Sequence, residues 1–182
     1  MRLFIGIDLP TEIKQVLLEF QLELRHLGVN GSWKLKDNFH ITLEFLGELD
    51  HSFVPELNQI LLKVAGNYRP FKLNIGGVGA FPSLKRPHTL WTALNGSLTE
   101  LNRLKDDLHC ELKNSGFKLE ERKFKPHITL ASRLQLENID LSVVHANKLG
   151  EFRVIEVVLF ESKVINSKIV YKGLQRASLE RN

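Results

Sequence analysis

The stretch Asn38–Phe45, "NFHITLEF", places His-Ile-Thr-Leu inside an apolar run, and the stretch Lys125–Ser132, "KPHITLAS", repeats the same four residues. The two histidines, at positions 40 and 127, are 87 positions apart in a chain of 182 residues. Short runs in which apolar and polar residues alternate are typical of strands. The repeated word therefore predicts two equivalent strands, at Phe39–Leu46 and Pro126–Ser132.

The segments before each word also repeat in the same order. The first word follows a predicted strand and helix at Arg2–Leu9 and Thr11–Leu27, and the second follows a strand and helix at His88–Asn95 and Ser97–Asn114. Both helices have apolar residues at spacings of three and four, and a glycine follows each of them. A strand, a helix, a glycine stop and a His-x-Thr strand thus recur at a nearly constant offset, which indicates an internal duplication.

These patterns predict an α+β fold. We expect one domain, residues 1–182, made of two pseudo-symmetric lobes that correspond to the sequence repeat 1–87 and 88–182. Each lobe is a mainly antiparallel sheet with helices on its outer face. The remaining predicted elements are a helix at Phe53–Ala65, strands at Phe71–Val78, Phe152–Glu161 and Ile169–Leu174, and a turn at Asn166–Ser167.

Composition and charge limit the classes of function. Apolar residues make up 43% of the chain, and the net charge of +4 is compatible with an anionic ligand such as RNA or a nucleotide. Cys110 is the only cysteine, which excludes an intrachain disulfide and a CxxC motif. No apolar run approaches the roughly 20 residues of a membrane span, and the N-terminal apolar stretch is too short for a signal peptide. We expect a cytoplasmic monomer that does not associate with a membrane and requires no protein partner.

Side chains alternate between the two faces of a strand, so each word divides into an apolar and a polar set. The apolar set packs beneath the helices of its lobe, and the polar set faces away from them. If a pseudo-twofold axis relates the lobes, both polar pairs face one central cleft. The apolar set is Ile41, Leu43, Phe45, Ile128 and Leu130, and the polar set is His40, Thr42, His127 and Thr129.

Three interpretations of the polar set are open. The pairs can be a hydrogen-bonded strand surface, although a repeated fold requires only the apolar positions to recur. They can bind a metal, but Glu44 is the one carboxylate on these faces and threonine is a poor zinc ligand. Two opposed imidazoles can also serve as acid and base, with threonine hydroxyls donating to phosphoryl oxygens. This last interpretation predicts metal-free cleavage of a phosphodiester, with the imidazoles roughly 5–8 Å apart.

The chain resembles the 2H phosphoesterases, which are named for two His-x-Thr/Ser motifs. Within that group it is similar to the RNA 2′,3′-cyclic phosphodiesterases, also called 2′-5′ RNA ligases. The resemblance covers almost the whole chain and is carried by "RLFIGIDLP", "FHITLEFLGE", "RPHTLW" and "KPHITLAS". It implies a bilobal fold with a central cleft. It also implies hydrolysis of the 2′,3′-cyclic phosphate of an RNA end or a small cyclic nucleotide to a 2′-phosphomonoester, with no metal and no cofactor.

The resemblance also implies roles for individual residues. His40 matches the proton donor to the leaving 3′-oxygen, and His127 matches the proton acceptor from water. Thr42 and Thr129 match the phosphate-binding residues. The family often has an arginine where this chain has Ser132, so Arg133 becomes a further phosphate-binding candidate if its strand stays regular.

Two other functions remain open. The same chemistry run backwards is 2′-5′ RNA ligation, and a chain that keeps the cleft without turnover is a non-catalytic RNA-binding module. Trp91 and Phe81 are either base-stacking residues or apolar core residues of a strand.

Overall fold

The computed structural model describes residues 1–121, 123–135 and 148–180. The boundaries of the three predicted helices agree with the structure to within one residue. The elements are, in order, β1 (Arg2–Asp8), α1 (Thr11–His26), β2 (Asn30–Trp33), η1 (Lys36–Asn38), β3 (His40–Glu48), η2 (His51–Phe53), α2 (Val54–Ala65), β4 (Phe71–Ser83), β5 (Arg86–Gly96), α3 (Leu98–Asn114), β6 (His127–Gln135), β7 (Gly150–Val154), β8 (Glu156–Ile165) and β9 (Lys168–Ser178).

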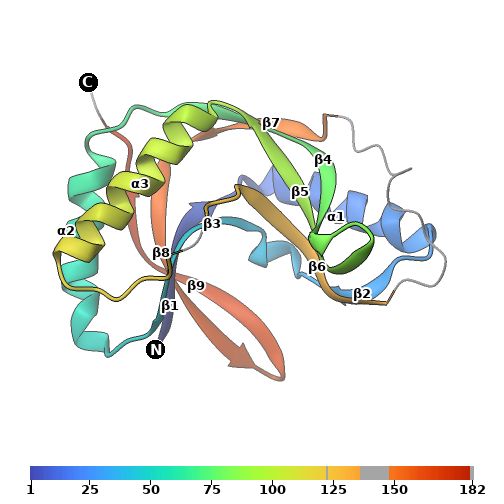
Figure 1. Cartoon of the computed structure of the whole chain (residues 1–182), viewed down its shortest axis with the longest axis horizontal. Coiled ribbons are helices and arrows are strands. Elements are labelled where there is room, and N and C mark those ends of the chain that lie inside the picture. Colours follow the sequence, from blue (N-terminus) through green and yellow to red (C-terminus); the bar gives the residue numbers. More distant parts are fainter. Residues whose placement is uncertain (122, 136–147, 181–182) are drawn as a thin grey trace.

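The strands form two antiparallel sheets, as expected (Figure 1). The first has the order β3-β1-β8-β9, and the second has the order β2-β6-β5-β4-β7. The turn expected at Asn166–Ser167 joins β8 to β9, and both residues have a positive φ, of 48° and 61°. Two-residue hairpin turns of this kind match the twist of the flanking strands.

Each sheet takes strands from both halves of the chain, which differs from our expectation of one lobe per half. β4, from the first half, lies between β5 and β7, and β8, from the second half, lies beside β1. The place of β4 has a local cause, because a loop of two residues joins β4 to β5 and short connections favour pairing of consecutive strands. The expected strand Phe152–Glu161 is divided at Ile155 into β7 and β8, which belong to different sheets.

Helices cover the outer faces of both sheets, as expected. Gln21, on α1, donates from Nε2 to the Leu130 carbonyl oxygen at 2.8 Å, so α1 lies on the sheet that contains β6. α2 packs against β8 and β9, and α3 packs against α2 and β3, so these two helices cover the other sheet (Figure 1). Within the described residues, no helix has both the length and the apolar character required to cross a membrane.

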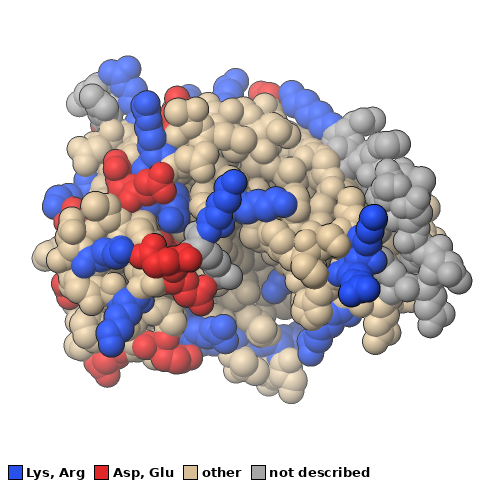
Figure 2. Space-filling model, in the orientation of Figure 1, with Lys and Arg blue, Asp and Glu red and all other residues tan. Residues whose placement is uncertain are grey.

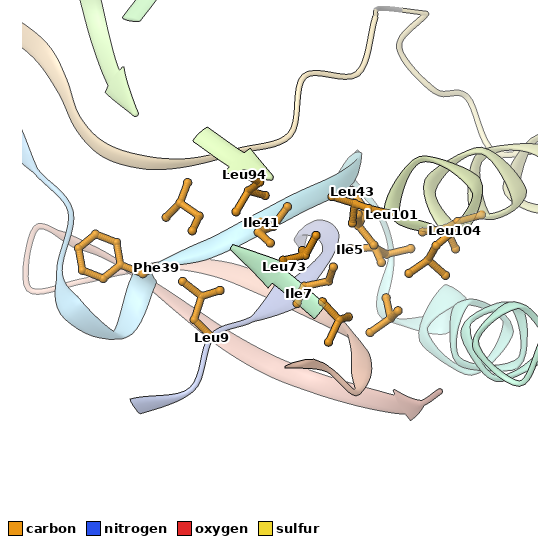
Figure 3. Close-up of a cluster of buried hydrophobic side chains, with 14 of the residues drawn as sticks. Ile5, Ile7, Leu9, Phe39, Ile41, Leu43, Leu73, Leu94, Leu101 and Leu104 are labelled. Atoms are coloured by element: carbon orange, nitrogen blue, oxygen red, sulfur yellow. The ribbon is translucent and has the colours of Figure 1, made fainter. Parts of the chain in front are cut away.

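One hydrophobic core connects the two sheets to the helices. The apolar residues of both repeated words belong to it, since Ile41, Leu43, Ile128 and Leu130 are at most 3% exposed. Figure 3 shows how side chains from β1, β3, β4, β5 and α3 meet there, among them Ile5, Leu73, Leu94 and Leu101. The prediction is therefore confirmed for these four residues. It is wrong for Phe45, which is 45% exposed because the register of β3 shifts at Leu43 and reverses the alternation that follows.

Candidate active site

Both motif strands have an irregularity at the same residue of the repeated word. In β3, Gly6 pairs with Thr42 and Ile5 pairs with Glu44, so Leu43 is an extra residue. In β6, Trp91 pairs with Thr129 and Leu90 pairs with Ala131, so Leu130 is an extra residue. Bulges of this kind redirect the side chains that follow and are common beside active sites. The duplication thus includes a bulge at the fourth residue of each His-Ile-Thr-Leu word.

The first bulge moves Glu44 away from the face on which regular alternation placed it. The Glu44 side chain is buried on the core side, where Nδ1 of His109 lies 2.7 Å from its Oε2 and Nζ of Lys105 lies 4.0 Å away. Glu44 therefore does not share the face of His40 and Thr42. Among the described residues, His, Cys, Asp and Glu side chains form no group of three or more with an arrangement suited to a metal ion.

The second bulge changes the position expected for Arg133. That expectation required a regular strand, but β6 is bulged at Leu130 and again shifts its register against β2. Arg133 has a φ of 52°, its side chain is exposed, and its Nε donates to Oγ of Ser32 at 3.1 Å. The condition that would place Arg133 on the face of His127 is therefore not met. Counting from the bulge, alternation places Ser132 on that face.

The His40 imidazole is held at both of its nitrogens. Nδ1 lies 2.8 Å from the Asn38 carbonyl oxygen, and Nε2 lies 2.9 Å from Oγ1 of Thr42. A carbonyl oxygen can only accept, so Nδ1 carries a proton and Nε2 of the neutral ring is free to accept one. The ring also contacts Phe4 and Tyr171, with centroid distances of 4.8 and 5.0 Å.

The His127 imidazole is oriented in the same way. Its Nδ1 lies 2.6 Å from the carbonyl oxygen of Lys125, which precedes it by two residues just as Asn38 precedes His40. Nδ1 of His127 therefore also donates, and the proton-accepting position is again Nε2. These two carbonyl contacts could not be predicted from the sequence pattern. They repeat with the words and give both imidazoles the same reactive nitrogen.

The pKa of His40 is lowered to about 4, mainly by burial and in addition by the charges of Lys34 and His127. The Asn38 carbonyl and the charge of Asp8 oppose this shift. Without a ligand, His40 is thus neutral at pH 7. The influence of one histidine on the pKa of the other means that their charges interact, as expected for β3 and β6, which approach each other. Their separation of roughly 5–8 Å remains a prediction.

Aromatic residues surround the His127 imidazole. Its centroid lies 5.0 Å from that of Phe81 and 6.0 Å from that of Trp91. Trp91 is 7% exposed and lies over Gly79, where an added Cβ would come within 2.1 Å of the indole ring. Trp91 is therefore a packed wall of the site. Phe81 is partly exposed and has the Lys125 ammonium 5.3 Å from its ring centroid.

Positive charge borders the space between the sheets. In Figure 2 the middle of the molecule is hollowed, and Lys and Arg side chains border the hollow, while Asp and Glu gather toward α2 and α3. Lys34, which follows β2, was not predicted as a site residue. Its charge acts on His40, and the charge of Arg133 acts on Lys34 in turn. No sequence signal identified Lys34, because its place depends on the pairing of β2 with β6, about 100 positions apart.

Comparison with known proteins is consistent with this geometry. Residues 7–91 and 95–171 match the family model described as LigT-like phosphoesterase. A protein of Methanocaldococcus jannaschii named RNA 2′,3′-cyclic phosphodiesterase is 32% identical over 96% of this chain and 99% of its own. A protein of the same name from Archaeoglobus fulgidus is 31% identical over 96% of this chain and 98% of its own.

Solved structures show the same fold. The crystal structure of TT0787 of Thermus thermophilus has a TM-score of 0.85 and 27% identity, and the match covers 100% of this chain and 99% of that one. The crystal structure of E. coli LigT complexed with 3′-AMP has a TM-score of 0.77 and 27% identity, with 99% of this chain and 98% of that one covered.

Proposed function

Because the chain belongs to the family of LigT-like phosphoesterases, we propose that it hydrolyses the 2′,3′-cyclic phosphate end of RNA to a 2′-phosphomonoester. The observation that carries the proposal is the duplicated arrangement of His40 and His127, each with Nδ1 on a carbonyl and a threonine two residues further along. The names of the relatives from M. jannaschii and A. fulgidus, and the 3′-AMP complex of E. coli LigT, support the choice of RNA as the substrate.

In the proposed reaction, a water oxygen attacks phosphorus while Nε2 of His127 takes a proton from that water. The bond from phosphorus to the 3′-oxygen breaks, and Nε2 of His40 gives its proton to this oxygen. The products are a 2′-phosphomonoester and a 3′-hydroxyl. The reaction leaves His40 neutral and His127 protonated, and proton exchange with solvent restores the starting state. General acid and general base catalysis each contribute about two to four orders of magnitude in rate, and neither step requires a metal.

The acid role requires a protonated His40, although its pKa in the free protein is lowered to about 4. An opposite charge within a few ångströms favours the charged form of a histidine. The cyclic phosphate is an anion, so its binding raises the pKa of His40 and supplies the protonated imidazole where it is used. In this proposal, substrate binding and protonation of His40 are one coupled event.

Thr42 and Thr129 hold the phosphate in this proposal. Thr42 already lies 2.9 Å from Nε2 of His40, so its hydroxyl is close to the nitrogen that donates the proton. Thr129 follows His127 by two residues on β6, as Thr42 follows His40 on β3. A hydroxyl near each reactive nitrogen can donate to a non-bridging oxygen and keep phosphorus between the two imidazoles.

Product analysis tests the proposal and separates it from the alternatives. We would incubate the protein in EDTA with a short RNA that ends in a 2′,3′-cyclic phosphate, with and without a second RNA that has a free 5′-hydroxyl. We expect a 2′-phosphomonoester in both reactions. A 2′-5′-joined RNA as the main product would instead establish ligation. Tight binding without any product would establish a non-catalytic RNA-binding module, and activity lost in EDTA would contradict the metal-free mechanism.

The proposed enzyme acts as a monomer in the cytoplasm. Both repeated motifs are in one chain, so a complete pair of imidazoles requires no second copy. Cys110 is exposed and unpaired, which suits a reducing compartment. Sedimentation equilibrium of the active protein tests the first statement, and a mass near twice the 20.9 kDa of one chain would contradict it.

A further inference from the structure

Lys34 projects from the edge of the second sheet toward the face that carries Thr129. Its neighbour Trp33 pairs with Ala131 and packs toward the core, with the Arg25 guanidinium 5.0 Å from its ring centroid. The Lys34 amide donates to the Leu130 carbonyl oxygen at 2.9 Å, so the pairing with β6 continues through Lys34. Consecutive side chains of a paired segment point to opposite faces. The Lys34 side chain therefore points away from α1, toward the face of His127 and Thr129.

Lys34 forms no ion pair with a carboxylate of the described residues. Within the described ranges 1–121, 123–135 and 148–180, none of the ion pairs within 4.0 Å includes Lys34. Its side chain is half-buried, and both burial and the charge of Arg133 lower its pKa. Arg133 is held beside it by the bond to Ser32. A partly desolvated ammonium next to a guanidinium is unfavourable unless an anion binds between the positive charges.

We propose that Lys34 is a phosphate-binding residue of the cleft, with Nζ donating to a non-bridging oxygen of the phosphate between His40 and His127. The inference rests on the proposed function. It identifies the Lys34 ammonium as the cation that contacts the reacting phosphate. The position suits this role because the charge of Lys34 reaches His40 in the opposite sheet. An anion that contacts both groups offsets their mutual repulsion. Arg133, whose Nε donates to Ser32, adds to the positive potential at Lys34.

Replacement of Lys34 by methionine tests the proposal, with Lys36→Met as the matched control. Both changes remove one ammonium from the same segment, but Nζ of Lys36 donates to Oε1 of Gln15 on α1 at 2.6 Å. The probe is inorganic phosphate, whose dissociation constant is measured by calorimetry. Loss of a charge-assisted hydrogen bond predicts roughly tenfold to hundredfold weaker binding for Lys34→Met. Binding by Lys36→Met should match the original protein, and Lys34→Arg should retain most of the affinity.

A second readout does not depend on phosphate. Because the charge of Lys34 lowers the pKa of His40, Lys34→Met should raise that pKa in an NMR titration, and Lys36→Met should leave it in place. Phosphate affinity in Lys34→Met equal to that of Lys36→Met would overturn the proposal. If phosphate binding depends on Lys34 but no cyclic phosphate is turned over, the inference stands and the proposed function fails. If cyclic phosphate is turned over but phosphate affinity does not depend on Lys34, the proposed function stands and the inference about Lys34 fails.

Discussion

At the scale of single residues, the candidate site depends on which nitrogen of each imidazole is reactive. The carbonyl oxygens of Asn38 and Lys125 bind the Nδ1 protons of His40 and His127, and this leaves Nε2 of both rings for chemistry. A ring with a free choice of tautomer would present the correct nitrogen only part of the time. Backbone carbonyls cannot be removed by substitution, so the threonines are the more accessible test of the arrangement.

Valine at Thr42 or Thr129 should lower turnover with little loss of stability. The change deletes the hydroxyl and keeps β-branching, which a strand tolerates. Loss of one hydrogen bond to a charged group is worth about 1.5–3 kcal/mol, which corresponds to roughly a tenfold to hundredfold loss of activity. The measurements are cyclic-phosphate hydrolysis and thermal melting.

Thr92→Val is the matched control for these variants. Thr92 lies on β5, is fully buried, and donates from Oγ1 to the Gly77 carbonyl oxygen at 2.9 Å. Its loss should lower the melting temperature and leave the turnover of the folded protein unchanged. If Thr42→Val and Thr129→Val behave as Thr92→Val does, the two hydroxyls serve the fold and have no part in binding phosphate.

The lowered pKa of His40 also predicts how stability depends on pH. The unfolded chain binds a proton at His40 near pH 6.5, and the folded protein does so only near pH 4. Between these values the unfolded state binds more protons, so the free energy of unfolding falls as the pH falls from 6.5 to 4. Urea unfolding at several pH values should show a smaller decrease for His40→Gln than for the original protein. The exposed His26→Gln is the control, and an equal decrease in all three proteins would contradict the assignment.

At the scale of elements, η1 is attached to the β8–β9 hairpin by one buried side chain. Asn38 donates from Nδ2 to the Ile169 carbonyl oxygen at 2.7 Å, and its Oδ1 accepts from the Tyr171 amide at 3.2 Å. The backbone carbonyl of the same residue holds His40. The hairpin in the first sheet therefore fixes the segment that orients the proposed acid. Figure 1 shows this hairpin extending beyond the rest of the sheet.

Asn38→Ala should weaken both stability and catalysis. It leaves the Ile169 carbonyl and the Tyr171 amide without their partner, which costs about 1–3 kcal/mol in the free energy of unfolding. It also loosens the carbonyl that orients His40, so turnover of the folded protein should fall. Asn102→Ala is the control, because the Asn102 amide bonds the Leu98 carbonyl oxygen on an exposed helix face. Equal effects of the two changes, in melting and in turnover, would contradict this role for Asn38.

Elements whose pattern is local could be predicted from the sequence. The helices α1 and α3 have regular apolar spacing and end before Gly28 and Gly116, which have φ values of 92° and 87°. The burial of Ile41, Leu43, Ile128 and Leu130 follows from alternation in the same way, whereas that of Phe45 does not. The bulges at Leu43 and Leu130 could not be predicted, because a register shift is a property of two paired strands. The same reason explains why Glu44 does not lie on the face where alternation placed it.

At the scale of the whole molecule, the two sheets are interdependent. Each contains strands from both halves of the chain, and one hydrophobic core reaches both. The sequence repeat showed that the chain is duplicated, but the pairing of β8 with β1 joins segments far apart in the sequence, and no local pattern records it. The consequence for the site is geometric. β3 and β6 approach each other, so the proposal that both His-x-Thr pairs contact one phosphate depends on how the two sheets pack.

The central claim is that His40 and His127 act on one phosphate, and alanine at each position tests it most directly. We would measure hydrolysis of a short RNA ending in a 2′,3′-cyclic phosphate for His40→Ala, His127→Ala and the double variant, with thermal melting to verify folding. Each single change should lower turnover by about two orders of magnitude or more. The double change should cost less than the product of the two single losses, since the residues act as one unit. A folded single variant that retains nearly full activity would contradict the two-histidine mechanism.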